Sequence, residues 1–191
     1  IRGVNTTSGA PAQQATSTAF SILAAISFCH LLNDMMQSLL PAIYPILKEN
    51  YGLTFAQIGF MTFTFQVTAS LLQPVIGFVT DRRPQPYSLA VGMGFSFLGL
   101  LLLSRAGSYP LLLTAAALVG LGSAVLHPES SRVARMAAGK QPGLAQSLFQ
   151  MGGNLGASIG PLFAAVVVLR FGQQSVAWFA LAAVLGMLLL V

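Results

Sequence analysis

Charged residues are scarce in this sequence. Only 7% of the 191 residues are Asp, Glu, Lys or Arg, whereas soluble domains average about 25%. The nine basic and four acidic side chains cannot cover the surface of a water-soluble domain of this length. Apolar residues make up 55% of the chain and stand in long continuous blocks. The composition therefore predicts a protein that lies in a lipid bilayer.

Motifs for metal, redox and nucleic-acid chemistry are also missing. Cys29 is the only cysteine, which excludes a disulfide within the chain and any CxxC motif. The chain has no HExxH motif, so we expect neither a metal ion nor a cofactor, and an intramembrane enzyme is the less favoured reading. Basic residues never exceed two in a row, so the net charge of +5 indicates contact with anionic lipid and no nucleic acid partner.

The apolar blocks predict six membrane-spanning helices. A helix needs about 20 apolar residues to cross the hydrocarbon core of a bilayer, and short connections with Gly, Pro or charge separate the blocks. We predict an all-α membrane fold, with a disordered cytoplasmic tail over residues 1–17 and a bundle over residues 18–191. The expected helices cover residues 20–44, 55–80, 87–104, 111–136, 144–169 and 176–191.

The basic residues predict the orientation of the bundle. Cytoplasmic loops of membrane proteins carry an excess of Lys and Arg. Six basic residues fall on the side of the N-terminus and three on the other, which places the N-terminus in the cytoplasm. The two sets are Arg2, Arg82, Arg83, Arg132, Arg135 and Lys140 against Lys48, Arg105 and Arg170.

Polar residues gather on four of the six helices. They recur at spacings of three or four residues, which places them on one face of each helix, and polar groups inside a membrane face protein or water. The pattern repeats after three helices, which favours an inverted 3+3 repeat of the kind found in secondary transporters. The amides predicted to line the substrate cavity are Gln37, Gln66, Gln73, Gln150 and Asn154.

Asp34 is the deepest carboxylate of the predicted bundle. A charged carboxylate near the middle of a membrane helix costs about 3 kcal/mol or more if it faces lipid. His30 lies four residues earlier on the same face. Both are candidates for proton coupling. The structural alternative is that Asp34 bonds to a neighbouring helix and that His30 is a buried core residue.

A second polar group stands at the predicted cytoplasmic end of the fourth helix. Glu129 is a third candidate for proton coupling, and His127 and Arg132 are candidates for binding an anionic substrate, since both can offer positively charged hydrogen-bond donors. The alternative is a helix-end ion pair of Glu129 with Arg132, three residues later, or with Arg82 or Arg83 in the neighbouring loop.

Two short motifs carry a resemblance to a known family. The stretch "GFVTDRR" resembles motif A of the major facilitator superfamily at Gly77, Asp81 and Arg82, although Pro84, Gln85 and Pro86 replace the rest of that motif. The stretch "GASIGP" resembles the antiporter motif C of the same family. The resemblance implies a gate for the first motif and a helix-packing seam for the second, the latter at Gly152, Gly156, Gly160 and Pro161.

A wider resemblance covers the chain from about residue 27. Stretches such as "CHLLNDMMQSLLPAIYP" and "GSAVLHPESSRVARMA" are similar to the fosmidomycin-resistance transporters of that superfamily. The resemblance implies a proton-driven efflux antiporter of the bacterial inner membrane with twelve helices, of which this chain holds the N-terminal six. The expected partners are lipid, protons, a small-molecule substrate and a C-terminal six-helix half. A symporter or uniporter for a sugar or an organic acid stays open as an alternative.

The predicted topology has a direct test. In a variant whose native Cys29 is replaced by Ala, single cysteines introduced at Gln85 and at Gln173 are exposed to an impermeant thiol reagent added outside intact cells. Only the cysteine at position 173 should react, because the charge rule places position 85 in the cytoplasm. Labelling of both positions from outside would contradict the topology.

Overall fold

Helices form all the regular structure of the residues that the structure describes. The computed structural model describes residues 17–83 and 85–191, so the predicted tail lies outside the described residues except for Ser17. Six helical spans are long and apolar enough to cross a membrane. The predicted all-α membrane fold with six spanning helices is therefore confirmed. The spans are Phe20–Ala42, Phe55–Arg82, Ser88–Arg105, Tyr109–Ala137, Pro142–Phe171 and Gln173–Leu190.

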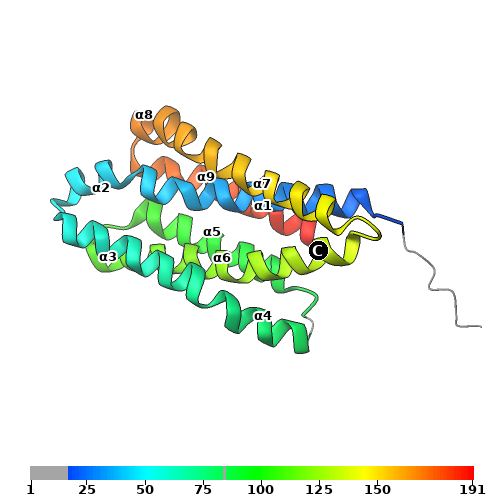
Figure 1. Ribbon diagram of the computed structural model, residues 1–191. Helices are drawn as coiled ribbons and strands as arrows, with labels where there is room; N and C mark the ends of the chain where they lie inside the picture. The colour runs from blue at the N-terminus through cyan, green and yellow to red at the C-terminus, as the bar shows by residue number, and fades with distance from the viewer. Residues whose placement is uncertain (1–16, 84) are drawn as a thin grey trace, which may run out of the picture.

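The spans are built from the helices labelled in Figure 1. α1, α5, α6 and α9 each form most or all of one span, whereas α3 and α4 together form the second and α7 and α8 the fifth. A π-helical turn interrupts the second span at Val67–Leu71 and the fifth at Ala164–Val168. The bounds are α1 (Phe20–Ala42), α2 (Tyr44–Tyr51), α3 (Phe55–Gln66), α4 (Gln73–Arg82), α5 (Ser88–Arg105), α6 (Tyr109–Ala137), α7 (Pro142–Phe163), α8 (Leu169–Phe171) and α9 (Val176–Leu190).

The first connection differs from the sequence prediction, because α2 forms where a loop was expected. Pro45 stands in the first turn of α2, where its missing N–H costs no hydrogen bond. Gly52 ends the helix with φ 60°, a left-handed conformation that glycine adopts without strain. Leu47 is fully buried and anchors α2 to the bundle.

The arrangement of the spans matches the pairing of an inverted repeat. α1 packs along α7, and α6 packs in the same way along α3 and α4. The first helix thus pairs with the fifth as the fourth pairs with the second, which is the relation that an inverted 3+3 repeat requires. In Figure 1, α7 and the α3–α4 span lie on opposite sides of the bundle, with α1 and α6 between them.

Glycines on α7 allow its backbone to approach that of α1. A Cβ atom added at Gly152 would overlap the carbonyl of Ser27, and one added at Gly156 would overlap the carbonyl of Leu31. A Cβ atom at Gly160 would overlap the Ser38 hydroxyl. Small residues at four-residue spacing permit such close contact between membrane helices. Pro161 follows this seam inside α7.

Substitution of one seam glycine should separate the two helices. We expect Gly156→Ala to destabilise the fold by about 1–3 kcal/mol, the usual cost of overpacking, because the new methyl group meets backbone that cannot rotate away. Gly59→Ala is the matched control, since a Cβ atom there meets nothing within 4 Å and alanine favours the helix. Thermal unfolding in detergent measures both, and equal melting temperatures for the two variants would contradict the close packing.

Candidate cation and substrate site

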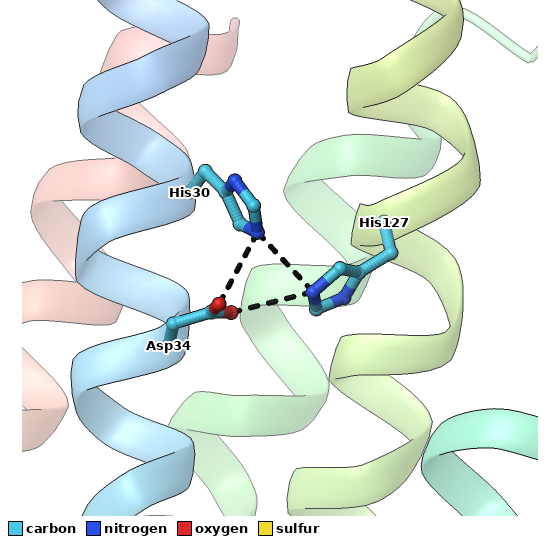
Figure 2. Close-up of side chains that lie close together, drawn as sticks. All are labelled: His30, Asp34 and His127. Atoms are coloured by element: carbon cyan, nitrogen blue, oxygen red, sulfur yellow. Dashed lines mark hydrogen bonds and ion pairs between the residues drawn. The ribbon is translucent and has the colours of Figure 1, made fainter. Parts of the chain in front are cut away.

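Three polar side chains meet between α1 and α6. His30 and Asp34 lie one turn apart on α1, and His127 reaches them from α6 (Figure 2). His30 Nε2 lies 3.2 Å from Asp34 Oδ2 and 3.2 Å from His127 Nε2. His127 Nε2 lies 3.4 Å from Asp34 Oδ1. We call His30, Asp34 and His127 the triad.

Backbone carbonyls set the tautomer of both imidazoles. His30 Nδ1 lies 2.8 Å from the carbonyl oxygen of Phe149, and His127 Nδ1 lies 3.0 Å from that of Ser123. A carbonyl oxygen only accepts hydrogen bonds, so these two bonds assign the hydrogen to each Nδ1. The Ser123 hydroxyl, 3.1 Å from His127 Nδ1, is then a second acceptor for that hydrogen. In the neutral imidazole the other nitrogen, Nε2, is then a bare electron-pair donor.

The triad therefore points three electron-pair donors at one another. Two bare Nε2 atoms and a carboxylate repel at these distances unless a cation lies between them. His30 is 1% exposed, whereas the side chains of Asp34 and His127 are 18% and 27% exposed. The site is closed on the side of His30 and open on the side of the other two residues, so a small cation can enter and leave.

Neighbouring groups hold the carboxylate in place. Asn33 and Gln37 donate amide hydrogen bonds to Asp34 Oδ1, at 3.0 and 3.1 Å. Gly153 on α7 leaves the space that the triad occupies, because a Cβ atom there would lie 2.6 Å from His30 Nε2 and 2.7 Å from Asp34 Oδ2. The seam between α1 and α7 thus also shapes the site.

The second polar group forms an ion pair near the end of α6. Arg132 Nη2 donates to Glu129 Oε2 at 2.7 Å, and the hydroxyl of Ser88 on α5 donates to the same oxygen at 3.0 Å. Glu129 is 1% exposed. The structure thus adopts the ion pair that the sequence left open as an alternative, and Arg132 is held by Glu129 in this conformation.

The remaining amide candidates lie on α3, α4 and α7. Gln150 and Asn154 are exposed on α7 and bond to each other at 3.2 Å. Gln66 is exposed on α3. Gln73 is half-buried, and its amide donates a hydrogen bond to the carbonyl oxygen of Ala69 at 2.7 Å. Ala69 lies within the π-helical turn.

The motif that resembles a gate lies at the end of α4. Asp81 and Arg82 are exposed, and the Arg82 guanidinium stacks on the Phe78 ring at 3.8 Å. A Cβ atom at Gly77 would meet Pro128 of α6 at 3.5 Å, an ordinary contact. Gly77 therefore marks where α4 approaches α6.

Sequence reasoning missed several groups of the site. The carbonyls of Phe149 and Ser123 belong to the backbone and leave no signal in the residue types. Gly153 stands directly after a seam glycine but faces the triad. Asn33 and Ser88 gave no periodic signal of their own, and only the bundle brings Ser88 to Glu129.

Comparison with known proteins identifies the family. The family model described as Major Facilitator Superfamily matches residues 26–191. The chain therefore belongs to the major facilitator superfamily of membrane transporters.

Two curated relatives are similar to the chain over nearly its whole length. The fosmidomycin resistance protein of Escherichia coli is 60% identical over 173 residues, which are 91% of this chain and 43% of that protein. The uncharacterized MFS-type transporter YfnC of Bacillus subtilis is 46% identical over 178 residues, which are 93% of this chain and 44% of that protein. The chain thus spans less than half the length of either relative.

Gly153 allows the triad to be disturbed without removing any of its polar groups. In Gly153→Ala the methyl group meets side chains, which can move, so we expect displacement of His30 and Asp34 with a smaller loss of stability than in Gly156→Ala. Carbethoxylation of His30, followed by mass spectrometry of its peptide, should be faster in Gly153→Ala than in the parent protein. An unchanged rate at His30 would show that the triad does not depend on Gly153.

Proposed function

We propose that this member of the major facilitator superfamily forms the N-terminal half of a proton-driven exporter of small anionic compounds. The observation that carries the proposal is the triad, in which a carboxylate and two imidazoles converge and require a cation. In the transport cycle that cation is a proton. The proton enters from one side of the membrane, is shared by the two Nε2 atoms beside Asp34, and leaves on the other side.

The position of the triad suits this role. His30 and Asp34 belong to α1 and His127 to α6 (Figure 2), the first and fourth helices of the bundle, which correspond to each other in an inverted repeat. Binding of a proton neutralises the repulsion between the two helices, and its loss restores it. Occupancy of the triad therefore changes the energy of the α1–α6 contact, which is what coupling of proton movement to a conformational change requires.

The charge pattern and the motifs supply the proposed orientation and gate. We place the protein in the cell inner membrane with a cytoplasmic N-terminus, because basic residues dominate the loops on that side. Asp81 and Arg82 lie at the end of α4 and are exposed there. With Gly77 against α6, we propose that they close the cytoplasmic side in one state of the cycle.

The exposed amides indicate where the cargo passes. Gln66, Gln150 and Asn154 stand on exposed faces of membrane-spanning helices, and such groups face protein or water. We propose that a second six-helix half covers these faces and that the cavity lies between the halves. Gln37 joins this cavity to the triad through its bond to Asp34.

The name of the Escherichia coli relative, fosmidomycin resistance protein, supplies a test compound. Fosmidomycin-type phosphonates are the proposed cargo, and their negative charge suits the guanidinium of Arg132 and, when the triad holds a proton, the imidazole of His127. Since Glu129 holds Arg132 here, binding of the cargo by Arg132 requires this ion pair to open. After the cargo is released, Arg132 would form the ion pair with the buried Glu129 again.

Transport by the full-length protein tests the proposal. In inverted membrane vesicles with an imposed pH gradient, the parent protein should accumulate fosmidomycin. Asp34→Asn should exchange the compound downhill but fail to concentrate it, as after addition of a protonophore, because an amide does not release a proton. Thr114→Val is the control, since the Thr114 hydroxyl is exposed and bonds only to Pro110 of its own helix.

Three outcomes would contradict the proposal. Accumulation by Asp34→Asn at the level of the parent would place the exchangeable proton elsewhere. Uptake by the parent that only equilibrates the compound, and is unchanged without the pH gradient and with the protonophore, would indicate a uniporter. Loss of exchange as well as accumulation in Asp34→Asn, with normal expression, would make Asp34 a structural residue.

A further inference from the structure

We propose that the triad is also a binding site for a divalent transition-metal ion, for which Zn²⁺ is the test case. His30 and His127 would each supply Nε2 and Asp34 a carboxylate oxygen. Among the residues that the structure describes, these three are the group of His, Cys, Asp and Glu side chains placed closely enough to hold a metal ion. The inference goes beyond the proposed proton coupling and does not depend on it.

The distances fit a tetrahedral ion. Ligands that lie about 2.0–2.1 Å from a tetrahedral zinc ion are about 3.3 Å from one another. The two Nε2 atoms lie 3.2 Å apart, His30 Nε2 lies 3.2 Å from Asp34 Oδ2, and His127 Nε2 lies 3.4 Å from the other carboxylate oxygen, Oδ1. Each of the three groups offers an atom within 4.8 Å of the others, so a metal ion fits once the Asp34 carboxylate turns one oxygen toward both nitrogens.

The outer hydrogen bonds also match those of metal sites. Histidines that bind metal commonly donate their other ring N–H to a carbonyl or carboxylate group, which fixes the tautomer and the ring orientation. His30 and His127 both do so, to the carbonyls of Phe149 and Ser123. The carboxylate of Asp34 is held by the amides of Asn33 and Gln37. Each proposed ligand is thus oriented from outside the site.

A metal ion satisfies the triad more completely than a proton does. A single proton lies on one nitrogen and is shared with one or two acceptors, whereas a metal ion accepts an electron pair from all three atoms at once. Two imidazoles and one carboxylate suit Zn²⁺, Co²⁺, Ni²⁺ or Cu²⁺, and they suit Mg²⁺ and Ca²⁺ poorly because those ions prefer oxygen. The partial exposure of Asp34 and His127 leaves room for water in the fourth position.

No short sequence motif predicts this site. The proposed ligands come from α1 and α6, and α2, α3, α4 and α5 lie between these helices in the sequence. The sequence prediction of no metal site rested on the absence of short motifs such as CxxC and HExxH. The proposed site departs from that prediction because only the packing of α1 against α6 brings the ligands together.

Zinc titration of the full-length protein tests the inference. The protein is purified without a histidine tag, treated with chelator, and titrated with Zn²⁺ in a calorimeter. We expect one ion per protein molecule. Removal of groups that only orient a ligand weakens metal binding about 10–100-fold, so Asp34→Asn, His30→Gln and His127→Gln should each weaken it at least that much. Thr114→Val is the control and should bind as the parent does.

X-ray absorption at the zinc edge of the unmodified protein keeps the test valid if a variant fails to fold. It should show two imidazole nitrogens about 2.0–2.1 Å from the ion. A ligand shell of oxygen or sulfur alone would overturn the inference, as would affinity that is equal in the parent and in all three variants. Binding is measured without transport, so failure of this inference and failure of the proposed export are separate results.

Discussion

The contact between α1 and α7 is the constraint on which the site depends. Glycines on α7 bring its backbone against the carbonyls of Ser27 and Leu31. The same close approach places the Phe149 carbonyl oxygen 2.8 Å from His30 Nδ1. At Gly153 it leaves room for the triad but no room for a Cβ atom. A larger side chain at Gly153 would meet His30 and Asp34, and one at Gly152 or Gly156 would meet the backbone of α1. The chemistry of the site thus follows from residues that have no side chain.

The triad is the chemical result of this packing. Both imidazoles donate their Nδ1 hydrogen to backbone carbonyls. The Nε2 atom of each ring, which then carries no hydrogen, points at the carboxylate of Asp34. Groups at these distances repel one another unless a cation lies between them. The proposed proton coupling and the proposed metal binding are two consequences of one geometry, and they differ in which cation occupies it. The Glu129–Arg132 pair on α6 is separate and already neutral.

Sequence reasoning reached the fold and part of the site. Composition and block length were sufficient for six spans, and four-residue spacing was sufficient to place His30 and Asp34 on one face. The same reasoning assigned His127 to the substrate and not to Asp34, because the rotation and height of α6 relative to α1 cannot be read from spacing within either helix. Phe149 acts through its carbonyl, which every residue has. α2 was missed although Pro45 and Gly52 mark its two ends.

The central claim is that both histidines carry their hydrogen on Nδ1 and share one cation between their Nε2 atoms. Nitrogen-15 NMR of histidine-labelled full-length protein in lipid measures this directly, with the two signals assigned by loss in His30→Gln and in His127→Gln. In chelator-treated protein, the account predicts a protonated Nδ1 on both rings and one hydrogen shared between the two Nε2 nitrogens. A hydrogen on Nε2 together with a bare Nδ1 on either ring would contradict it.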